Sequence, residues 1–213
     1  MVIFMKKISK KRHLEMIIQN IPPFQNPKVE LEQYSTPSTI AADLLWNAYS
    51  FGDISDKNIV DLGCGTGIFS IASSLLGANE VFAVDIDGQS IEIAKNTAEK
   101  MGICNINFFI SDVSNFSLDK KTDTLFQNPP FGSQKTSKKG SDLKFIDLAL
   151  NISRVIYSFH MASTRDYIYN YFNKKDAKVT DEFNYEFIIP KLYDFHKKEK
   201  KHVNVVAFRV ENF

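Results

Sequence analysis

The chain has 213 residues, of which 44% are hydrophobic and 24% charged, and its formal net charge is +1. This length suffices for one domain with a complete hydrophobic core, and the charge balance neither requires nor excludes a nucleic-acid partner. No apolar run approaches the ~20 residues of a membrane-spanning helix, and the first residues lack the order of a signal peptide. We therefore expect a cytoplasmic protein with no membrane partner.

The chain has two cysteines, Cys64 and Cys104, and neither belongs to a C-x-x-C pair. A self-contained zinc site needs ligands at such short spacings, so we expect no bound metal. Two thiols in a chain of this composition are expected to stay reduced.

The first 37 residues are predicted to form an N-terminal segment made of one helix and a lid. Residues 6–20 are basic and then amphipathic, and Pro22-Pro23 ends the helix because proline lacks an N–H and disfavours helix in the preceding residue. Residues 24–37 are expected to form a loop. The basic residues at the start form either a basic arm or a frayed terminus.

Residues 38–213 are predicted to form a second unit in which strands and helices alternate. Helices are expected over 38–51, 68–76, 90–101, 143–152 and 164–173, the last with Ser163 as its N-cap. Strands are expected over 58–62, 81–86, 106–110, 123–127, 155–161, 178–188 and 203–210. This alternation predicts an α/β fold with a seven-stranded, mostly parallel sheet and helices on both faces. The last two strands have only a short connection, which predicts a C-terminal antiparallel hairpin at one edge.

A glycine-rich segment, Asp61-Leu-Gly-Cys-Gly-Thr-Gly67, follows the first strand and opens a helix. Gly63, Gly65 and Gly67 lack a Cβ, so the backbone can turn sharply and approach a ligand closely. The spacing is G-x-G-x-G and not the G-x-G-x-x-G of dinucleotide-binding loops. The loop therefore favours S-adenosylmethionine over a dinucleotide.

Acidic residues end three successive strands, at Asp61, Asp85 and Asp112. Ligands in such sheets bind outside the carboxyl ends of the strands. Asp61 can accept a hydrogen bond from the methionine ammonium, directly or through water, while Asp85 can bind both ribose hydroxyls and Asp112 the adenine amino group. Ile86 and Val113 follow the last two acids and complete the predicted cofactor site. Each aspartate also has a structural alternative: fixing the loop backbone, capping the following helix, or closing a turn.

The segment Asn128-Pro129-Pro130-Phe131 follows the fourth strand and has the composition of a catalytic turn. Proline has no donor, so the carbonyls here are free of the strand ladder and the turn is rigid. The Asn128 side-chain oxygen and the Pro129 carbonyl can each accept one N–H of an exocyclic amine, which would be held toward a methyl group. Phe131 offers a ring on which a base can stack. The alternative is a strand that simply stops at a proline turn.

Together these motifs resemble the class I, S-adenosylmethionine-dependent amino-methyltransferases. A closer resemblance, to the archaeal and eukaryotic small-subunit rRNA adenine-N6 methyltransferases (methyltransferase-like family five), covers residues from about 28 to the C-terminus. It rests on Leu31-Glu-Gln-Tyr34 with Thr36, Phe131-Gly132, Gly140-Ser-Asp142, Val155-Ile-Tyr-Ser-Phe-His160, Ser163-Thr-Arg165 and Phe195-His-Lys-Lys198. The chain departs from this family at Ser35, where proline is frequent, and at Met161, where lysine is frequent.

The resemblance implies a Rossmann-like class I methyltransferase fold and an N6-methyladenosine product in small-subunit rRNA. It also implies that Gln33, Tyr34 and Thr36 close over the cofactor, and that a small Trm112-like zinc-binding partner covers a hydrophobic surface. Contacts to structured RNA are predicted, with solvated surface as the alternative, for six residues: Lys135, Lys138, Lys139, His160, Lys197 and Lys198.

Three other functions stay open at this point. The same chemistry can serve DNA adenine or cytosine, or a protein glutamine, although glutamine enzymes of this type usually carry tyrosine where this chain has Phe131. A non-catalytic, RNA-binding subunit can keep this fold. A nicotinamide-dependent oxidoreductase is favoured only by Asp85.

Overall fold

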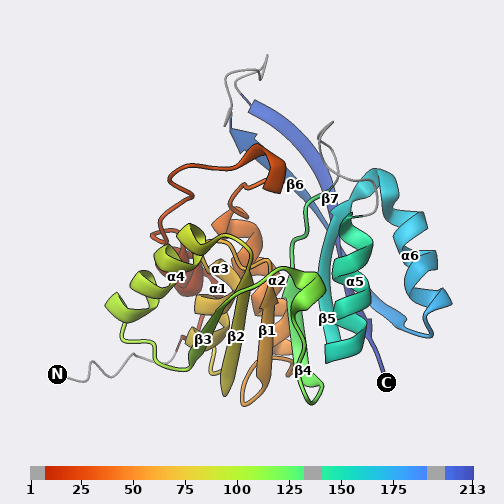
Figure 1. Cartoon of the computed structure of the whole chain (residues 1–213), viewed down its shortest axis with the longest axis horizontal. Coiled ribbons are helices and arrows are strands. Elements are labelled where there is room, and N and C mark those ends of the chain that lie inside the picture. Colours follow the sequence, from red (N-terminus) through yellow and green to blue (C-terminus); the bar gives the residue numbers. More distant parts are fainter. Residues whose placement is uncertain (1–7, 132–140, 191–199) are drawn as a thin grey trace.

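The computed structural model describes residues 8–131, 141–190 and 200–213, and seven strands within these ranges form one sheet (Figure 1). The strands are β1 (Asn58–Leu62), β2 (Glu80–Asp85), β3 (Ile106–Ile110), β4 (Thr122–Gln127), β5 (Ser153–Met161), β6 (Lys178–Pro190) and β7 (Lys200–Glu211). Their order in the sheet is β3-β2-β1-β4-β5-β7-β6. β1 to β5 pair in parallel, and β7 is antiparallel to both β5 and β6. The predicted fold class is confirmed, including the C-terminal hairpin.

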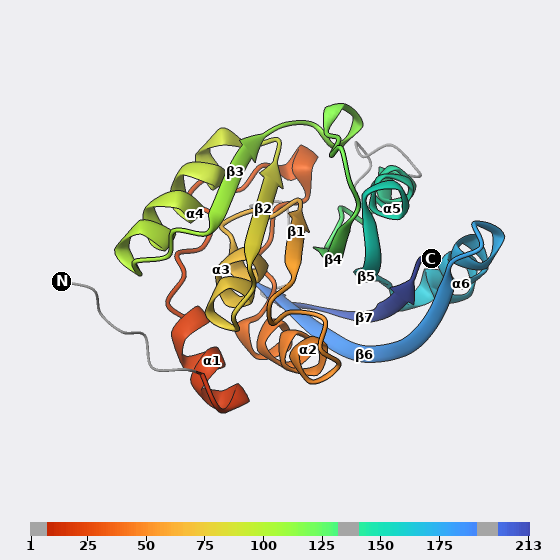
Figure 2. The same ribbon diagram turned by 90° about the horizontal axis from the view of Figure 1, so that it is seen from below.

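Helices cover both faces of the sheet (Figure 2). They are α1 (Lys11–Ile18), α2 (Ser38–Ser50), α3 (Ile68–Leu75), α4 (Gly88–Lys100), α5 (Ser141–Ile152) and α6 (Arg165–Lys174). α1 to α4 lie on one face, and α5 and α6 lie on the other. Within the described ranges, none of these helices is long and apolar enough to cross a membrane.

The core is split by the sheet into two layers, and the residues of β1 show how. Ile59 packs in the layer beneath α1, α2 and α3, whereas Val60 and Leu62 pack in the layer beneath α5 and α6. All three side chains are fully buried. Successive residues of a strand point to opposite faces, and a parallel strand covered on both faces therefore has a mostly apolar sequence.

The first helix belongs to this core, because Leu14 and Ile18 of α1 are buried against α2 and α3. The division into a unit of residues 1–37 and a unit of residues 38–213 thus stays a prediction, and it applies best to the segment that links α1 to α2. That segment was predicted to be all loop, but it contains a short 3-10 helix, η1 (Val29–Leu31). In Figure 1 the segment runs along the carboxyl edge of the parallel strands.

The predicted N-cap of α6 is wrong. Ser163 lies inside a second 3-10 helix, η3 (Ala162–Thr164), and α6 begins at Arg165 with no side-chain cap. The hydroxyl of Thr164 donates to the Met161 carbonyl at 2.9 Å, which closes this turn ahead of the helix.

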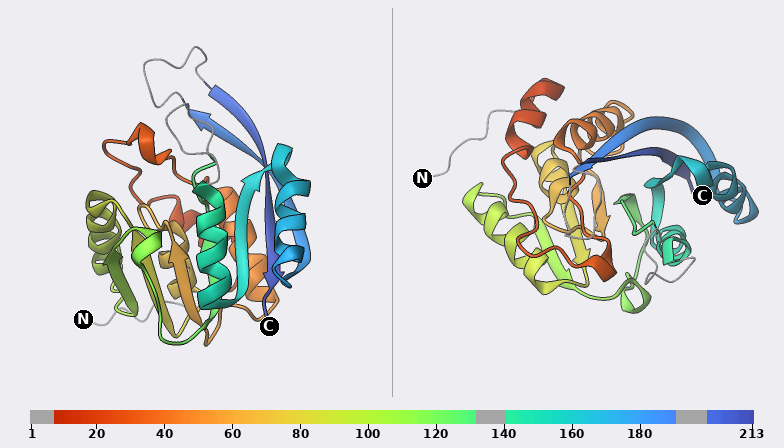
Figure 3. Two further views of the ribbon diagram at one scale, coloured as in Figure 1. Left: turned by 45° about the vertical axis from the view of Figure 1, so that its right-hand side comes forward. Right: turned by 90° about the horizontal axis from the view of Figure 1, so that it is seen from above.

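The hairpin of β6 and β7 rises beyond the carboxyl ends of the parallel strands (Figure 3). β5 ends at Met161 opposite Val205, so residues 200–204 of β7 pair with β6 alone. Phe187 and Val203 on this overhang are buried and join the first core layer. The overhang therefore walls one side of the carboxyl edge.

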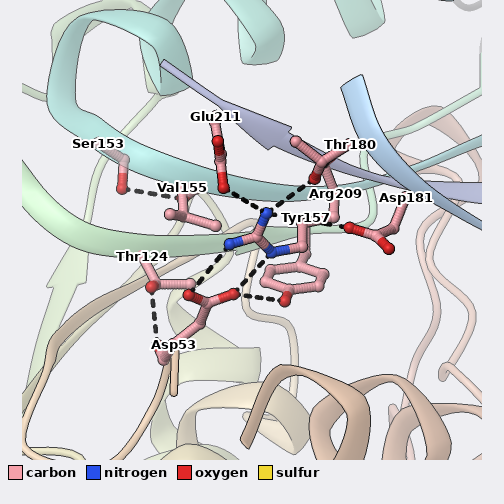
Figure 4. Close-up of polar contacts among 9 residues, drawn as sticks. All are labelled: Asp53, Thr124, Ser153, Val155, Tyr157, Thr180, Asp181, Arg209 and Glu211. Atoms are coloured by element: carbon pink, nitrogen blue, oxygen red, sulfur yellow. Dashed lines mark hydrogen bonds and ion pairs between the residues drawn. The ribbon is translucent and has the colours of Figure 1, made fainter. Parts of the chain in front are cut away.

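A buried ion pair fixes β7 to the rest of the sheet (Figure 4). Arg209 Nε donates to Asp53 Oδ2 at 2.8 Å, and the hydroxyl of Tyr157 donates to the same oxygen at 2.7 Å. The Asp53 carbonyl accepts from Thr124 in β4 at 2.7 Å. One loop residue thus joins β4, β5 and β7, with both carboxylate oxygens of Asp53 bonded.

Candidate active site

Two adjoining cavities lie at the carboxyl edge of the parallel strands. The first, of about 200 Å³, is lined by residues that follow β1, β2, β3 and β4 and by the segment between α1 and α2. The second, of about 350 Å³, is lined by the end of α1, residues 34–38 and the start of α3. Five residues line both cavities: Phe24, Tyr34, Gly63, Gly65 and Asn128. A ligand that spans the two cavities must therefore pass Asn128.

The glycine loop between β1 and α3 has two distinct parts. Gly63 and Gly65 line both cavities, and a Cβ on Gly65 would lie 2.7 Å from Cζ of Phe24. Gly67 has a φ of +87° and lines neither of them, and a Cβ there would lie 3.0 Å from Cβ of Ala94 in α4. The absence of a Cβ at Gly67 lets α3 and α4 pack closely, and the predicted ligand contact of this residue stays a prediction.

Asp61, at the end of β1, is fully buried behind the loop and lines neither cavity. Its Oδ2 accepts hydrogen bonds from the backbone N–H of Ser70, at 2.8 Å, and from the Ser70 hydroxyl. Its Oδ1 is buried with no hydrogen-bond partner among the described residues. Burial raises the pKa of Asp61 to about 7. One carboxylate oxygen of Asp61 thus has no partner behind the glycine loop, and the predicted contact with the methionine ammonium, direct or through water, stays a prediction.

Asp85 connects the glycine loop to the turn after β2. Its Oδ2 accepts from the N–H of Gly65 at 2.7 Å, and its Oδ1 accepts from the N–H of Asp87 at 2.8 Å. Burial raises the pKa of Asp85, against the effect of these hydrogen bonds. Asp85 and the half-exposed Ile86 both line the first cavity. The helix that follows is capped by Asp87, which accepts from the N–H of Gln89 at 3.2 Å, so the alternative of Asp85 as the cap is wrong.

Asp112, after β3, combines a turn with a place in the first cavity. Its Oδ1 accepts from the N–H of Ser114 at 2.7 Å and opens the short helix η2 (Val113–Asn115). This backbone hydrogen bond lowers the pKa of Asp112. Asp112 and Val113 both line the cavity. The turn predicted as the structural alternative is confirmed, and the adenine contact stays a prediction.

The segment between α1 and α2, which we call the lid (residues 24–37), is tied to the start of α4. Gln33 Nε2 donates to Asp87 Oδ2 and Lys28 Nζ donates to Asp87 Oδ1, both at 2.8 Å. The Gln33 Oε1 in turn accepts from the Lys28 N–H at 2.8 Å. Burial opposes ionisation of Asp87, but these bonds and that from Ser90 lower its pKa to about 2. Gln33 lines the first cavity with its amide already bonded at both ends.

Asn128, the first residue of the predicted catalytic turn, meets the lid directly. The Tyr34 hydroxyl donates to Asn128 Oδ1 at 3.2 Å, and Asn128 Nδ2 donates to Thr36 Oγ1 at 3.1 Å. Asn128 lines both cavities together with Gly63 and Gly65. The turn that follows β4 therefore faces the glycine loop.

The other three residues of the turn lie in different surroundings. Pro130 lines the first cavity, whereas Pro129 is buried. Phe131 lines neither cavity and packs beside Tyr34, with ring centroids 5.9 Å apart. The stacking surface predicted for Phe131 is thus shared with Tyr34.

The predicted RNA contact of His160 is wrong. Its side chain is 1% exposed, and its Nε2 lies 2.7 Å from the hydroxyl of Ser158. Burial lowers the pKa of His160 to about 3, so the ring is neutral. The other five residues predicted to contact RNA lie outside the described residues: Lys135, Lys138, Lys139, Lys197 and Lys198.

Three residues of the site were missed in the sequence. Phe24 lines both cavities and covers Gly65, and Phe145 of α5 lies beside Gly63. Neither position has a local signal, because each acts only through a distant contact. Asp87 could have been found, since an aspartate shortly before the helix predicted over 90–101 has the residue type of an N-cap. In the described parts of the chain, no group of three or more His, Cys, Asp or Glu side chains could hold a metal ion.

A comparison with protein families agrees with this geometry. The model of the methyltransferase small domain family matches residues 39–154, which is more than half of the chain. The chain belongs to this family. Its members are methyltransferases that use S-adenosylmethionine, and the cavities fit that cofactor, with a glycine cradle, aspartates after β2 and β3, and an unpartnered carboxylate oxygen behind the loop.

Relatives of this methyltransferase match along nearly its whole length. The rRNA N(6)-adenosine-methyltransferase Mettl5 of Drosophila melanogaster is 35% identical over 207 residues, 95% of this chain and 96% of the relative. An uncharacterized protein of Methanocaldococcus jannaschii is 39% identical over 212 residues, 95% and 94% of the two chains. A crystal structure described as a proposed RNA methyltransferase of Pyrococcus horikoshii is 36% identical with a TM-score of 0.87, covering 96% and 98%. The resemblance predicted from the sequence is confirmed.

Proposed function

We propose that this methyltransferase transfers a methyl group from S-adenosylmethionine to the N6 amine of adenine in RNA, and specifically in small-subunit rRNA. The observation that carries the proposal is the position of Asn128, which follows β4 and lines both cavities where they adjoin. Full-length relatives that bear the name of rRNA N(6)-adenosine-methyltransferases support the choice of acceptor.

The acceptor nitrogen sets the chemical problem. The lone pair of an exocyclic amine is delocalised into the base, so the nitrogen must become pyramidal before it attacks. Two acceptors at the turn, Asn128 Oδ1 and the Pro129 carbonyl, would each take one N–H and hold the nitrogen toward the methyl group. The same oxygens would stabilise positive charge as it develops. A neutral amide is no base near pH 7, so the proton leaves after transfer.

S-adenosylmethionine supplies the methyl group, and each of the two cavities would bind a different part of this cofactor. We assign the adenosine end to the first cavity, where Asp85 and Asp112 offer acceptors and Ile86 offers an apolar side chain. The amino-acid end belongs to the second cavity along Gly63 and Gly65, with the unpartnered Oδ1 of Asp61 behind it. This division places the transferred group beside Asn128, which both cavities share.

The acceptor base would stack on the aromatic wall formed by Phe131 and Tyr34. Stacking on such side chains contributes about 1–3 kcal/mol per base at other single-strand platforms. A paired adenine must first leave its helix. An unpaired or flipped adenine in structured RNA is therefore the expected substrate.

We also propose that the small zinc-binding partner implied by the resemblance pairs with β3. This strand is the sheet edge beside β2, and Phe109 and Ile110 on it are 38% and 66% exposed. The connection from β3 to β4 contains η2 and no α-helix, so one face of the edge lacks the helical cover of the other strands. An exposed apolar edge strand is a site for strand addition.

Coexpression tests this partner surface. A bound partner is expected to raise the midpoint of thermal unfolding, and Ile110→Glu is expected to remove that gain. Ile188→Glu is the matched control, because Ile188 is similarly exposed on β6 at the opposite sheet edge. Docking at β3 would be contradicted if the two variants lose the gain in unfolding midpoint equally, or if neither loses it.

Transfer of labelled methyl groups to three acceptors tests the reaction: small-subunit rRNA, DNA and release-factor protein. We expect label at adenine N6 in the rRNA, at a position left unmethylated in cells that lack the gene. Asn128→Ala should lower kcat by about 10²–10³-fold, while calorimetry still detects cofactor binding. Label on DNA or protein with none on rRNA would reject the proposed acceptor. Absence of cofactor binding by the unaltered chain, alone or with a partner, would favour the non-catalytic RNA-binding subunit.

A further inference from the structure

The side-chain amide of Asn128 is held at both ends by two residues of the lid. Tyr34 donates to its oxygen at 3.2 Å, and Thr36 accepts from its nitrogen at 3.1 Å. These contacts span 94 and 92 positions of sequence. The lid and the catalytic turn are therefore joined through one side chain.

The orientation of this amide decides whether the proposed chemistry works. The oxygen and the NH2 group of an asparagine have nearly the same shape but opposite hydrogen-bonding character. An amide turned by half a rotation would present N–H groups to an amine that also donates. The structure has the productive orientation, with the Tyr34 hydroxyl donating to the oxygen and Thr36 Oγ1 accepting from the nitrogen. One lone pair of Oδ1 stays free for the acceptor amine.

Tyr34 is suited to this task because its ring has little freedom. It packs against Phe131 and Phe187, with both ring centroids 5.9 Å away. Burial raises the pKa of the Tyr34 phenol, so the hydroxyl keeps its proton at any physiological pH. A neutral, fixed donor thus faces Asn128.

The lid also connects Tyr34 to the cofactor side of the site. Gln33, its neighbour in sequence, bonds Asp87, which lies two residues beyond Asp85 of the first cavity. Lys28 bonds the same aspartate. A lid displaced from the start of α4 would carry Tyr34 and Thr36 away from Asn128.

We propose that Tyr34 and Thr36 are positioning residues that hold the Asn128 amide with its oxygen toward the acceptor amine. They act through Asn128 and need not touch the acceptor. The inference rests on the proposed function, because it assigns Asn128 to acceptor binding. It makes closure of the lid and alignment of the catalytic amide a single structural event.

Kinetics of four variants test this role: Tyr34→Phe, Thr36→Val, Thr36→Ser and Asn128→Ala. Tyr34→Phe and Thr36→Val each remove one hydrogen bond and should lower kcat by about three- to tenfold, while the cofactor Kd changes by less than about twofold. Thr36→Ser keeps the hydroxyl and should restore the original kcat. Tyr185→Phe is the matched control: its hydroxyl bonds Asp43 at 2.9 Å and it lines neither cavity.

A double variant separates positioning from general support of the fold. In the Asn128→Ala background, Tyr34→Phe should have no further effect on kcat, because the group it orients is gone. An added loss there would overturn the proposal. A Tyr34→Phe variant with unchanged or raised kcat would also overturn it, since the hydroxyl would then only occupy the place of the acceptor amine. A large change in cofactor Kd with kcat unchanged would make Tyr34 a cofactor ligand instead.

Nuclear magnetic resonance of the Asn128 side-chain amide supplies a readout that needs no acceptor. The resonance is identified by its absence in Asn128→Ala, and it should shift in Tyr34→Phe and Thr36→Val but not in Tyr185→Phe. If the resonance is unchanged in both Tyr34→Phe and Thr36→Val, the positioning role of these two residues is rejected. If the chain methylates DNA or protein and not RNA, the proposed acceptor fails, while these measurements still decide the role of Tyr34 and Thr36.

Discussion

Two buried aspartates, Asp53 in the loop before β1 and Asp61 within β1, differ in how their carboxylates are bonded. Asp53 has hydrogen bonds on both carboxylate oxygens, from Arg209 and Tyr157. Asp61 has hydrogen bonds on Oδ2 alone, and its Oδ1 is buried without a partner among the described residues. Both residues are buried, at 8% and 0% exposed, so exposure does not distinguish them.

The difference lies in what each carboxylate still lacks. A buried charge without a partner is costly, and the molecule satisfies Asp53 entirely from its own side chains. At the glycine loop, Oδ1 of Asp61 has no such partner among the described residues. An unsatisfied buried polar group in a folded protein needs an explanation, such as a bound water, an ion or a catalytic role.

Removal of Asp53 should have the largest effect on stability. Asp53→Ala leaves the buried guanidinium of Arg209 without its main partner, although Glu211 still accepts from it at 2.8 Å. Breaking one side of a buried pair costs about 3–5 kcal/mol, and we expect a value near the lower end. Urea unfolding measures the loss. Lys175→Ala, which breaks the half-exposed pair with Asp147, is the control and should leave the midpoint unchanged.

If Asp53→Ala lowers the free energy of unfolding no more than Lys175→Ala does, Asp53 is not the structural carboxylate that the comparison with Asp61 requires. The cofactor Kd supplies a second check. It should be unaltered in Asp53→Ala under conditions where the variant is folded, because Asp53 lines neither cavity.

Most of the sheet could be predicted from the sequence because its signals are local. The short runs over 58–62 and 106–110, each followed by turn residues, predict the observed bounds of β1 and β3. The position of Asp85 and Asp112 at one edge follows from parallel pairing alone. Local patterns therefore define the cofactor side of the site well.

The contacts that join distant segments could not be predicted. Asp53 meets Arg209 across 156 positions, and Tyr34 meets Asn128 across 94. No periodicity records which polar side chains will pair at such separations. The error at His160 has the same origin, because β7 continues past this residue and pairs Val206 with it, which removes the expected strand end from solvent.

Asp61 should make cofactor binding depend on pH. Its folded pKa of about 7 lies above the usual value for an aspartate of about 3.9, so the carboxyl is largely protonated below pH 7 in the free protein. A cationic ammonium favours the carboxylate, and affinity should rise with pH from 5.5 to about 7, by at most about tenfold per unit. Calorimetry at four pH values measures this slope. Asp61→Asn should bind more weakly at pH 7.5 and lose the slope.

The raised pKa of Asp61 also predicts the direction in which stability changes with pH. A folded pKa above the unfolded one stabilises the fold at low pH, and this contribution is lost as the pH rises through about 7. The free energy of unfolding should therefore fall between pH 4.5 and 7 by more in the unaltered chain than in Asp61→Asn. Equal pH slopes in the two proteins, for both binding and unfolding, would place Asp61 with Asp53 as a purely structural carboxylate.

The smallest effect is expected at Asp87. This residue lies beside the site, but both of its carboxylate oxygens accept hydrogen bonds, as those of Asp53 do. Its oxygens accept from Lys28 and Gln89 on one side and from Gln33 and Ser90 on the other. Asp87→Ala should lower the free energy of unfolding by about 1 kcal/mol, as expected for a lost N-cap. Ser163→Ala, at the wrongly predicted cap of α6, should lower it by less than about 0.5 kcal/mol.

The effect of Asp87→Ala on activity tests whether Asp87 also holds the lid in place. The loss of its bonds to Gln33 and Lys28 frees the lid, so kcat should fall in the same direction as in Tyr34→Phe. Asp87→Asn keeps one acceptor oxygen, which can serve Gln33 or Gln89 but not both, and it should recover only part of the two losses. A fall in kcat with no loss of stability would instead mean that Asp87 contacts the ligand directly. Hydrogen bonds on both carboxylate oxygens would then not be enough to identify a structural aspartate in this fold.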